Sequence, residues 1–241
     1  MDISVCMATF NGVDYISEQI DSIVSELSGY DYELIIVDDC STDDTVSFLK
    51  TYSKRYSQIK IYQNTLNVGH VNSFEKALKI CCGDYIFLAD QDDIWIKGRA
   101  DLMLDSMKSS CKSVIFSGLV FFNEDFNAKG NHLVIPPLGI SNIVNVIKIF
   151  FGVANYWGCS MLLKKDFLIK AIPFNKYVES HDIWLASVGL INNEIKSIEN
   201  PTIYHRIHSK NKTPIKKRPI SKIIFTRIKF LLGVLHCVYH K

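Results

Sequence analysis

The chain has 241 residues, of which 48% are hydrophobic and 22% are charged, and its formal net charge is +2. That length and hydrophobic content suffice for one large α/β domain, or for one domain with a short appendage. The small net charge gives no indication of nucleic acid as a partner. The seven cysteines are scattered and include no CxxC pair, so we expect neither a disulfide framework nor a zinc cluster, and a reducing compartment fits best.

The start of the sequence shows no targeting signal. Residues 1–5 enter a strand-like run directly, without the basic and long apolar regions of a signal peptide. No uninterrupted apolar run approaches the ~20 residues that span a bilayer. We therefore expect a cytoplasmic protein.

The first half alternates predicted strands and helices. The apolar runs that predict strands are residues 3–8, 33–37, 59–62 and 85–88. Between them, helical spacing predicts one helix over residues 14–27, a second that opens with a capping box at residues 41–44, and a third that carries Phe74 and Leu78. Such alternation favours an α/β fold with a mostly parallel central sheet and helices on both faces.

The second half is less regular. Strands are expected at residues 113–122, 158–163 and 202–207, and helices at 141–151 and from about Asp182 onward. The segment 210–218 is basic, contains two prolines and is typical of a linker. We therefore divide the chain into a domain over residues 1–211 and a basic linker with a C-terminal helix over residues 212–241.

Polar segments follow three of the predicted strands. They are residues 9–12, 38–39 and 90–93. In a sheet of this kind, ligands bind outside the carboxyl ends of the strands, so the three segments predict one shared crevice.

The segment Asp90-Gln91-Asp92-Asp93 carries the sharpest chemical signal. Three carboxylates within four residues repel one another unless a cation lies between them, and oxygen ligands of this kind suit Mg²⁺ or Mn²⁺. A solvated acidic turn that caps the next helix is the alternative. The position at a strand end favours metal.

The other two strand-end segments allow more than one interpretation. Asp38 and Asp39 suit a phosphoacceptor pair, a contact to a nucleotide base or a helix-capping turn, and residues 9–12 suit a plain turn.

Two segments near the C-terminal end of this domain add further candidates. At residues 179–184 a carboxylate stands before an apolar helix, either as an N-cap or as a general base. In the run 204–208, strand alternation places Tyr204, Arg206 and His208 on one face, where Arg206 and His208 suit diphosphate or metal.

Together these motifs resemble family 2 of the glycosyltransferases, which have the GT-A fold, over roughly residues 3–211. The resemblance rests on residues 8–11, 37–43, 67–69 and 90–95, in that order. The DQDDIW form of the acidic segment, together with residues 155–161, 181–184 and 204–211, is similar to the rhamnosyltransferase branch of bacterial polysaccharide synthesis. In this branch dTDP-rhamnose is the usual donor.

The resemblance implies a role for each matching residue of an inverting hexosyltransferase. The nucleotide-binding residues would be Thr9, Phe10, Asn11, Asp38, Asp39, Asn67, Gly69, Asp90 and Arg206. Asp92 and His208 would bind Mg²⁺ or Mn²⁺, and Asp182 would deprotonate the acceptor hydroxyl. Implied partners are a dTDP-, UDP- or GDP-linked sugar and a glycan or lipid-linked acceptor, with acceptor recognition in the region 123–157.

Three other classes compete with this interpretation. A nucleotidyltransferase would favour a Gly-rich phosphate loop after the first strand, which residues 9–12 lack. A receiver-like regulatory domain predicts about half this length and leaves Asp182 and His208 unexplained. A non-catalytic sugar-binding relative would not need Asp92 and Asp182.

The C-terminal segment 220–241 has an apolar face with helical spacing and one narrow polar stripe. An apolar face that wide must be buried. It packs either on the protein itself or in a homodimer, or it lies in the plane of a membrane surface with Lys216, Lys217 and Arg218 at anionic headgroups. The second arrangement would make the protein peripheral on the cytoplasmic face of the membrane.

Overall fold

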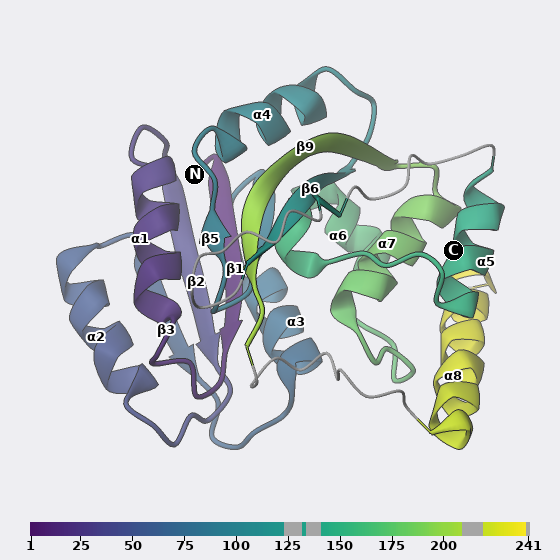
Figure 1. Ribbon diagram of the computed structural model, residues 1–241, viewed down its shortest axis with the longest axis horizontal. Helices are drawn as coiled ribbons and strands as arrows, with labels where there is room; N and C mark the ends of the chain where they lie inside the picture. The colour runs from purple at the N-terminus through teal and green to yellow at the C-terminus, as the bar shows by residue number, and fades with distance from the viewer. Residues whose placement is uncertain (123–131, 134–140, 209–218, 240–241) are drawn as a thin grey trace.

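The computed structural model describes residues 1–122, 132–133, 141–208 and 219–239, which form a central sheet flanked by helices (Figure 1). The strands are β1 (Ile3–Thr9), β2 (Tyr32–Asp38), β3 (Ile59–Gln63), β4 (Tyr85–Ala89), β5 (Ile94–Trp95), β6 (Val114–Phe122), β7 (His132–Leu133), β8 (Met161–Lys164) and β9 (Ile195–Arg206). The helices are α1 (Ile16–Glu26), α2 (Thr45–Arg55), α3 (His70–Ile80), α4 (Arg99–Lys108), α5 (Asn142–Phe151), α6 (Leu168–Ala171), α7 (His181–Ile191) and α8 (Ile220–Tyr239), with short 3-10 turns η1 (Gly158–Ser160) and η2 (Lys165–Phe167).

The sheet runs in the order β3-β2-β1-β4-β8-β6-β9-β5, and β7 pairs with β6. The strands β1 to β4 are parallel neighbours, as their alternation with α1, α2 and α3 predicts. β8 is antiparallel to both β4 and β6, and β5 is antiparallel to β9. The sheet is therefore mixed. In this half of the sheet β6 and β9 still pair in parallel, and the connection between them contains α5 and α7.

Two apolar cores lie on the two faces of the sheet. One contains Phe74, Leu78 and Trp184 from α3 and α7, and the other contains Ile16 and Ile20 from α1. Every residue of β2 is buried, because helices cover this strand on both faces. In α1, the apolar residues whose spacing predicts the helix lie on its buried face.

Several boundaries differ from those the sequence predicts. Helix α1 begins at Ile16 and α2 at Thr45. The predicted capping box does not form at α2; instead the Asp43 carboxylate accepts the Thr45 backbone N–H at 3.0 Å. The sequence did not predict β5, β7 or α6. Helix α4 follows Gly98, whose φ of +85° starts it in a conformation that favours glycine.

Helix α8 lies against α5 and α7 (Figure 1). Phe230 packs on the core, Arg227 donates to the carbonyl oxygen of Ile149 at 3.0 Å, and Lys229 pairs with Glu179 at 2.8 Å. Part of α8 is thus packed on the protein itself. The linker with Lys216, Lys217 and Arg218, the boundary at residue 211, and residues 123–131 and 134–140 of the expected acceptor region lie outside the described residues.

Much of the apolar surface of α8 and α5 stays exposed. The large exposed side chains on these two helices and just after α5 are Ile143, Val144, Ile147, Phe151, Val153, Ile223, Ile224, Phe225, Ile228, Leu231, Leu232 and Leu235. Within the part of the chain that the structure describes, no helix has the length and hydropathy that a membrane crossing requires.

Candidate functional site

The carboxyl ends of β1, β2 and β4 open onto one cleft of about 1570 Å³, as the strand-end segments predict. Thr9, Phe10, Asp39, Asp90 and Asp92 line it. Residues far along the chain also line it: Asp182 at the start of α7, His205 on β9, and residues of α8. The cleft therefore joins the predicted nucleotide and metal residues to the predicted base.

Gln91 ties the acidic segment to the end of β1. Its side chain accepts the Phe10 backbone N–H at 2.9 Å and donates to the Phe10 carbonyl at 3.2 Å. A Cβ on Gly12 would lie 2.3 Å from the Gln91 Oε1 atom, so a larger residue there would displace the Gln91 side chain. Gln19 of α1 also donates to the Asp90 carbonyl oxygen at 2.9 Å. These contacts fix the carboxylates at the strand end.

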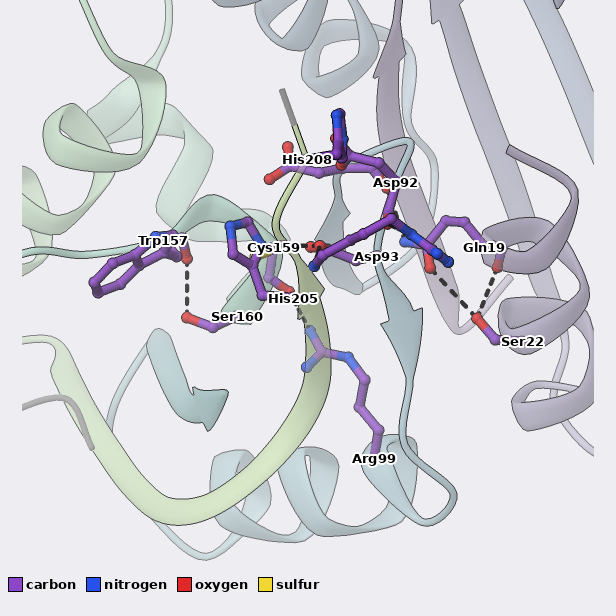
Figure 2. A network of polar contacts seen from close by, with 12 residues as sticks. Gln19, Ser22, Asp92, Asp93, Arg99, Trp157, Cys159, Ser160, His205 and His208 are labelled. Atoms are coloured by element: carbon purple, nitrogen blue, oxygen red, sulfur yellow. Dashed lines mark hydrogen bonds and ion pairs between the residues drawn. The ribbon is translucent and has the colours of Figure 1, made fainter. Parts of the chain in front are cut away.

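Asp92 and His208, the two predicted metal ligands, lie side by side (Figure 2). His208 Nε2 is 2.8 Å from Asp92 Oδ2, and the Tyr15 ring stacks on the imidazole at 4.4 Å. Burial and the neighbouring Asp93 charge raise the pKa of Asp92, although the His208 hydrogen bond opposes that shift. A carboxylate oxygen and an imidazole nitrogen, both possible metal ligands, thus lie together beyond the end of β4.

Asp90 is the most perturbed carboxyl group of the segment. Burial, followed by the charges of Asp93 and Asp92, raises the pKa of Asp90 to about 8. Asp90 therefore holds a proton near neutral pH, and a cation in the cleft would favour its ionised form.

Asp93 has partners that the sequence analysis missed. Its Oδ1 atom lies 2.8 Å from His205 Nδ1, and the Cys159 thiol lies 3.9 Å from the same nitrogen. Burial disfavours the imidazolium, but the charge and hydrogen bond of Asp93 outweigh burial and raise the pKa of His205 to about 9. Strand alternation along residues 204–208 could have identified His205, because it lies on the opposite face of the strand from Tyr204, Arg206 and His208.

Arg206 is buried behind the cleft and is not among its described lining residues. Its Nε donates to the Asp92 carbonyl at 3.0 Å, its Nη2 pairs with Glu18, and the guanidinium lies over the Phe122 ring at 4.6 Å. The side chain thus holds the backbone of the acidic segment.

Most of the predicted nucleotide residues shape loops around the cleft. Asp38 is fully buried and accepts the Ser41 backbone N–H at 2.9 Å, while its other oxygen accepts the Thr9 hydroxyl at 3.1 Å. Asp39 lines the cleft, but its two oxygens accept the backbone N–H groups of Val68 at 2.9 Å and Gly69 at 2.8 Å. Both carboxylates are therefore already bonded within the protein.

The two predicted nucleotide-binding residues still to be placed are the asparagines Asn11 and Asn67. Asn11 has a left-handed φ of 49°, and its side chain accepts the Thr42 N–H at 2.8 Å. Asn67 is exposed in the loop before α3. Among the described lining residues of the cleft, neither asparagine is present.

Asp182 lies at the first turn of α7 and faces the cleft. Ser180 donates to its Oδ1 atom, which also accepts the Ile183 N–H at 2.7 Å, and burial raises the pKa of Asp182. The preceding residue, His181, is buried and stacks on Phe74 at 3.9 Å. The Asp182 carboxyl is thus held firmly, with a pKa shifted toward the range that a general base needs.

Comparison with known proteins agrees with this arrangement. Residues 4–171 match the model of glycosyl transferase family 2. The dTDP-rhamnosyl transferase RfbG of Shigella flexneri is 30% identical over 224 residues, which cover 85% of this chain and 72% of that protein. The putative teichuronic acid biosynthesis glycosyltransferase TuaG of Bacillus subtilis is 32% identical over 51% of this chain.

The chain is shorter than several relatives. It spans 48% of the length of TuaG and 15% of the poly(ribitol-phosphate) beta-glucosyltransferase of Bacillus spizizenii, to which it is 39% identical over 95 residues.

Solved structures share the fold. TarS 1-349 of S. aureus in complex with UDP-GlcNAc superposes with a TM-score of 0.76, over 98% of this chain and 67% of that one, at 19% identity. The mannosyltransferase PcManGT of Pyrobaculum calidifontis in complex with GDP-Man and Mn²⁺ gives 0.62 over 99% of this chain and 64% of that one, at 16% identity. The chain therefore has the GT-A fold and belongs to glycosyl transferase family 2.

Proposed function

We propose that the chain is an inverting, metal-dependent glycosyltransferase of bacterial surface polysaccharide synthesis. The observation that carries the proposal is that Asp92 and Asp182 line one cleft of a family 2 domain. Rhamnose from dTDP-rhamnose is the first donor to test, because RfbG bears the name of a dTDP-rhamnosyl transferase. The acceptor is a hydroxyl of a glycan or of a lipid-linked glycan.

Asp92 and His208 fit a divalent cation. They offer one carboxylate oxygen and one imidazole nitrogen, a set that suits Mn²⁺ and, with water and phosphate oxygens completing the sphere, Mg²⁺. Burial, followed by the charge of Asp93, raises the pKa of Asp92, and a cation held there would favour the ionised carboxylate. When bound, the ion neutralises charge on the leaving diphosphate.

Asp182 performs the proton transfer. Its carboxylate accepts the proton of the acceptor hydroxyl as that oxygen bonds to the anomeric carbon from the face opposite the diphosphate. The bond from the anomeric carbon to the phosphate oxygen breaks, and the nucleoside diphosphate leaves. A single displacement inverts the anomeric centre and needs no second carboxylate as nucleophile.

The nucleoside lies against the end of β1 and the loop after β2. Thr9, Phe10 and Asp39 contact it directly because they line the cleft, and Asp90 faces its ribose or phosphate. Asn11, Asp38, Asn67 and Gly69 act by shaping the loops. Arg206 acts as a positioning residue for Asp92, whose carbonyl it holds.

The enzyme associates with a membrane surface through α5 and α8. Both helices expose large apolar side chains, and the basic residues Lys216, Lys217 and Arg218 precede α8 in the sequence. The cleft reaches α8, so an acceptor held at the membrane would enter from that side. A homodimer that buries the same surface is the competing outcome.

A thermal-shift screen tests the proposed function. dTDP-, UDP- and GDP-linked sugars are each added with Mn²⁺ and with EDTA, to the wild type and to Asp92→Ala. A ligand that binds only the native state raises Tm. We expect one nucleotide class to raise the Tm of the wild type with Mn²⁺ and to leave Asp92→Ala unchanged. No shift with any nucleotide sugar would contradict the proposal.

A further inference from the structure

A second cluster of metal-ligating side chains lies beside the Asp92–His208 pair. Asp90, Asp93, Cys159 and His205 each offer one ligand atom, and these four atoms all lie within 4.8 Å of one another. They come from the segment after β4, from η1 and from β9. Figure 2 shows Asp93, Cys159 and His205 converging at the centre of the polar network.

The ligand types differ from those of the Asp92–His208 pair. A thiol, an imidazole and two carboxylates are the set that favours Zn²⁺ and similar transition metals, whereas Mg²⁺ avoids sulfur. In a tetrahedral zinc site the ligand atoms are about 3.5 Å apart, given the usual bond lengths. The distances of 2.8 Å from Asp93 to His205 and 3.9 Å from Cys159 to His205 lie on either side of that value.

The surrounding residues hold this cluster in place. Arg99 is buried and donates from Nη2 to the Cys159 carbonyl oxygen at 2.7 Å, which fixes η1. The Arg206 backbone N–H donates to Asp93 Oδ1 at 3.2 Å. Asp93 is fully buried, and its second oxygen, Oδ2, has no hydrogen-bond partner among the described residues. An unpartnered buried carboxylate oxygen is costly unless a cation or a donor reaches it.

We propose that these four residues bind one Zn²⁺-class ion, separate from the ion assigned to Asp92 and His208. The ion enters from the cleft, because Asp90 and His205 line it. Binding displaces the Cys159 thiol proton, the proton of the Asp90 carboxyl and the proton shared by His205 and Asp93. Mg²⁺ does not enter the site, because it avoids thiolate ligands.

Co²⁺ is the probe for this site, because its absorption spectrum reports thiolate ligation. The full chain, with its thiols reduced, is titrated with CoCl₂. We expect a thiolate-to-cobalt charge-transfer band that Zn²⁺ abolishes and excess Mg²⁺ leaves intact. A wild-type protein that binds Co²⁺ without such a band would overturn the proposal, whatever the behaviour of any variant.

Matched variants locate the site. Cys159→Ser should lose the band and weaken Zn²⁺ binding on the order of tenfold or more, since even outer-shell changes cost that much. Cys111→Ser, which changes an exposed cysteine, and His208→Ala should both keep the band. A band that survives in Cys159→Ser, or one that disappears in His208→Ala, would place the ion elsewhere and refute the proposal. These readouts are independent of catalysis.

Discussion

Asp182 is the residue on which turnover depends most in this account. We expect Asp182→Asn to keep donor binding and to lower turnover by a factor on the order of 10²–10⁴, because the amide cannot accept the acceptor proton. Turnover and nucleotide affinity are measured in parallel. The comparison variant is Glu179→Gln, because Glu179 also lines the cleft, pairs with Lys229 at 2.8 Å and is the next candidate for the base. Normal turnover in Asp182→Asn would move the base elsewhere.

The pH dependence of the reaction provides a second test of the same carboxyl. Burial raises the pKa of Asp182 above its ordinary value of about 3.9. The base works only when ionised, so activity is present above the raised pKa and is lost as the pH falls through it. We expect the acid limb of kcat/KM to lie above the ordinary pKa of an aspartate and to disappear from the residual activity of Asp182→Asn. An acid limb unchanged in that variant would assign it to another group.

At the scale of elements, the contact between η1 and α7 sets the position of the base. A Cβ on Gly158 would lie 2.5 Å from His181 Nε2, so Gly158→Ala must shift the buried His181 ring or the start of α7 that carries it. We expect a loss of about 1–3 kcal/mol in unfolding free energy together with reduced turnover. Gly29→Ala is the control, because its Cβ would meet nothing within 4 Å. Denaturant unfolding measures the stability of the two variants. Equal unfolding free energies for Gly158→Ala and Gly29→Ala would contradict the contact.

The α5–α8 surface is tested by flotation with anionic vesicles at low salt. The double variant Phe225→Asp and Ile228→Asp places charges on residues that are 56% and 50% exposed, so packing is spared. We expect the wild type to float and the variant to remain at the bottom, while Leu66→Asp on a distant loop floats like the wild type. A wild type that does not float would assign this surface to a protein contact, and light scattering would then show a dimer.

At the scale of the whole molecule, the parts of the site that follow strands could be predicted. Residues 9–12, 38–39 and 90–93 each carry a local signal, and the α/β alternation brings their strand ends together. The Asp93–Cys159–His205 cluster was not predicted, because its members come from segments separated by dozens of residues and joined only by the mixed half of the sheet. Strand alternation also predicted Arg206 as a nucleotide-binding residue, whereas its neighbour His205 lines the cleft.

The central claim is that a nucleotide sugar binds through a metal held at Asp92. Isothermal titration of dTDP, UDP and GDP into the wild type with Mn²⁺, into the wild type with EDTA and into Asp92→Ala with Mn²⁺ tests it most directly. The account predicts that one nucleotide binds the wild type with Mn²⁺ and that its Kd weakens by about tenfold or more in both other cases. Equal affinity in all three would contradict the account.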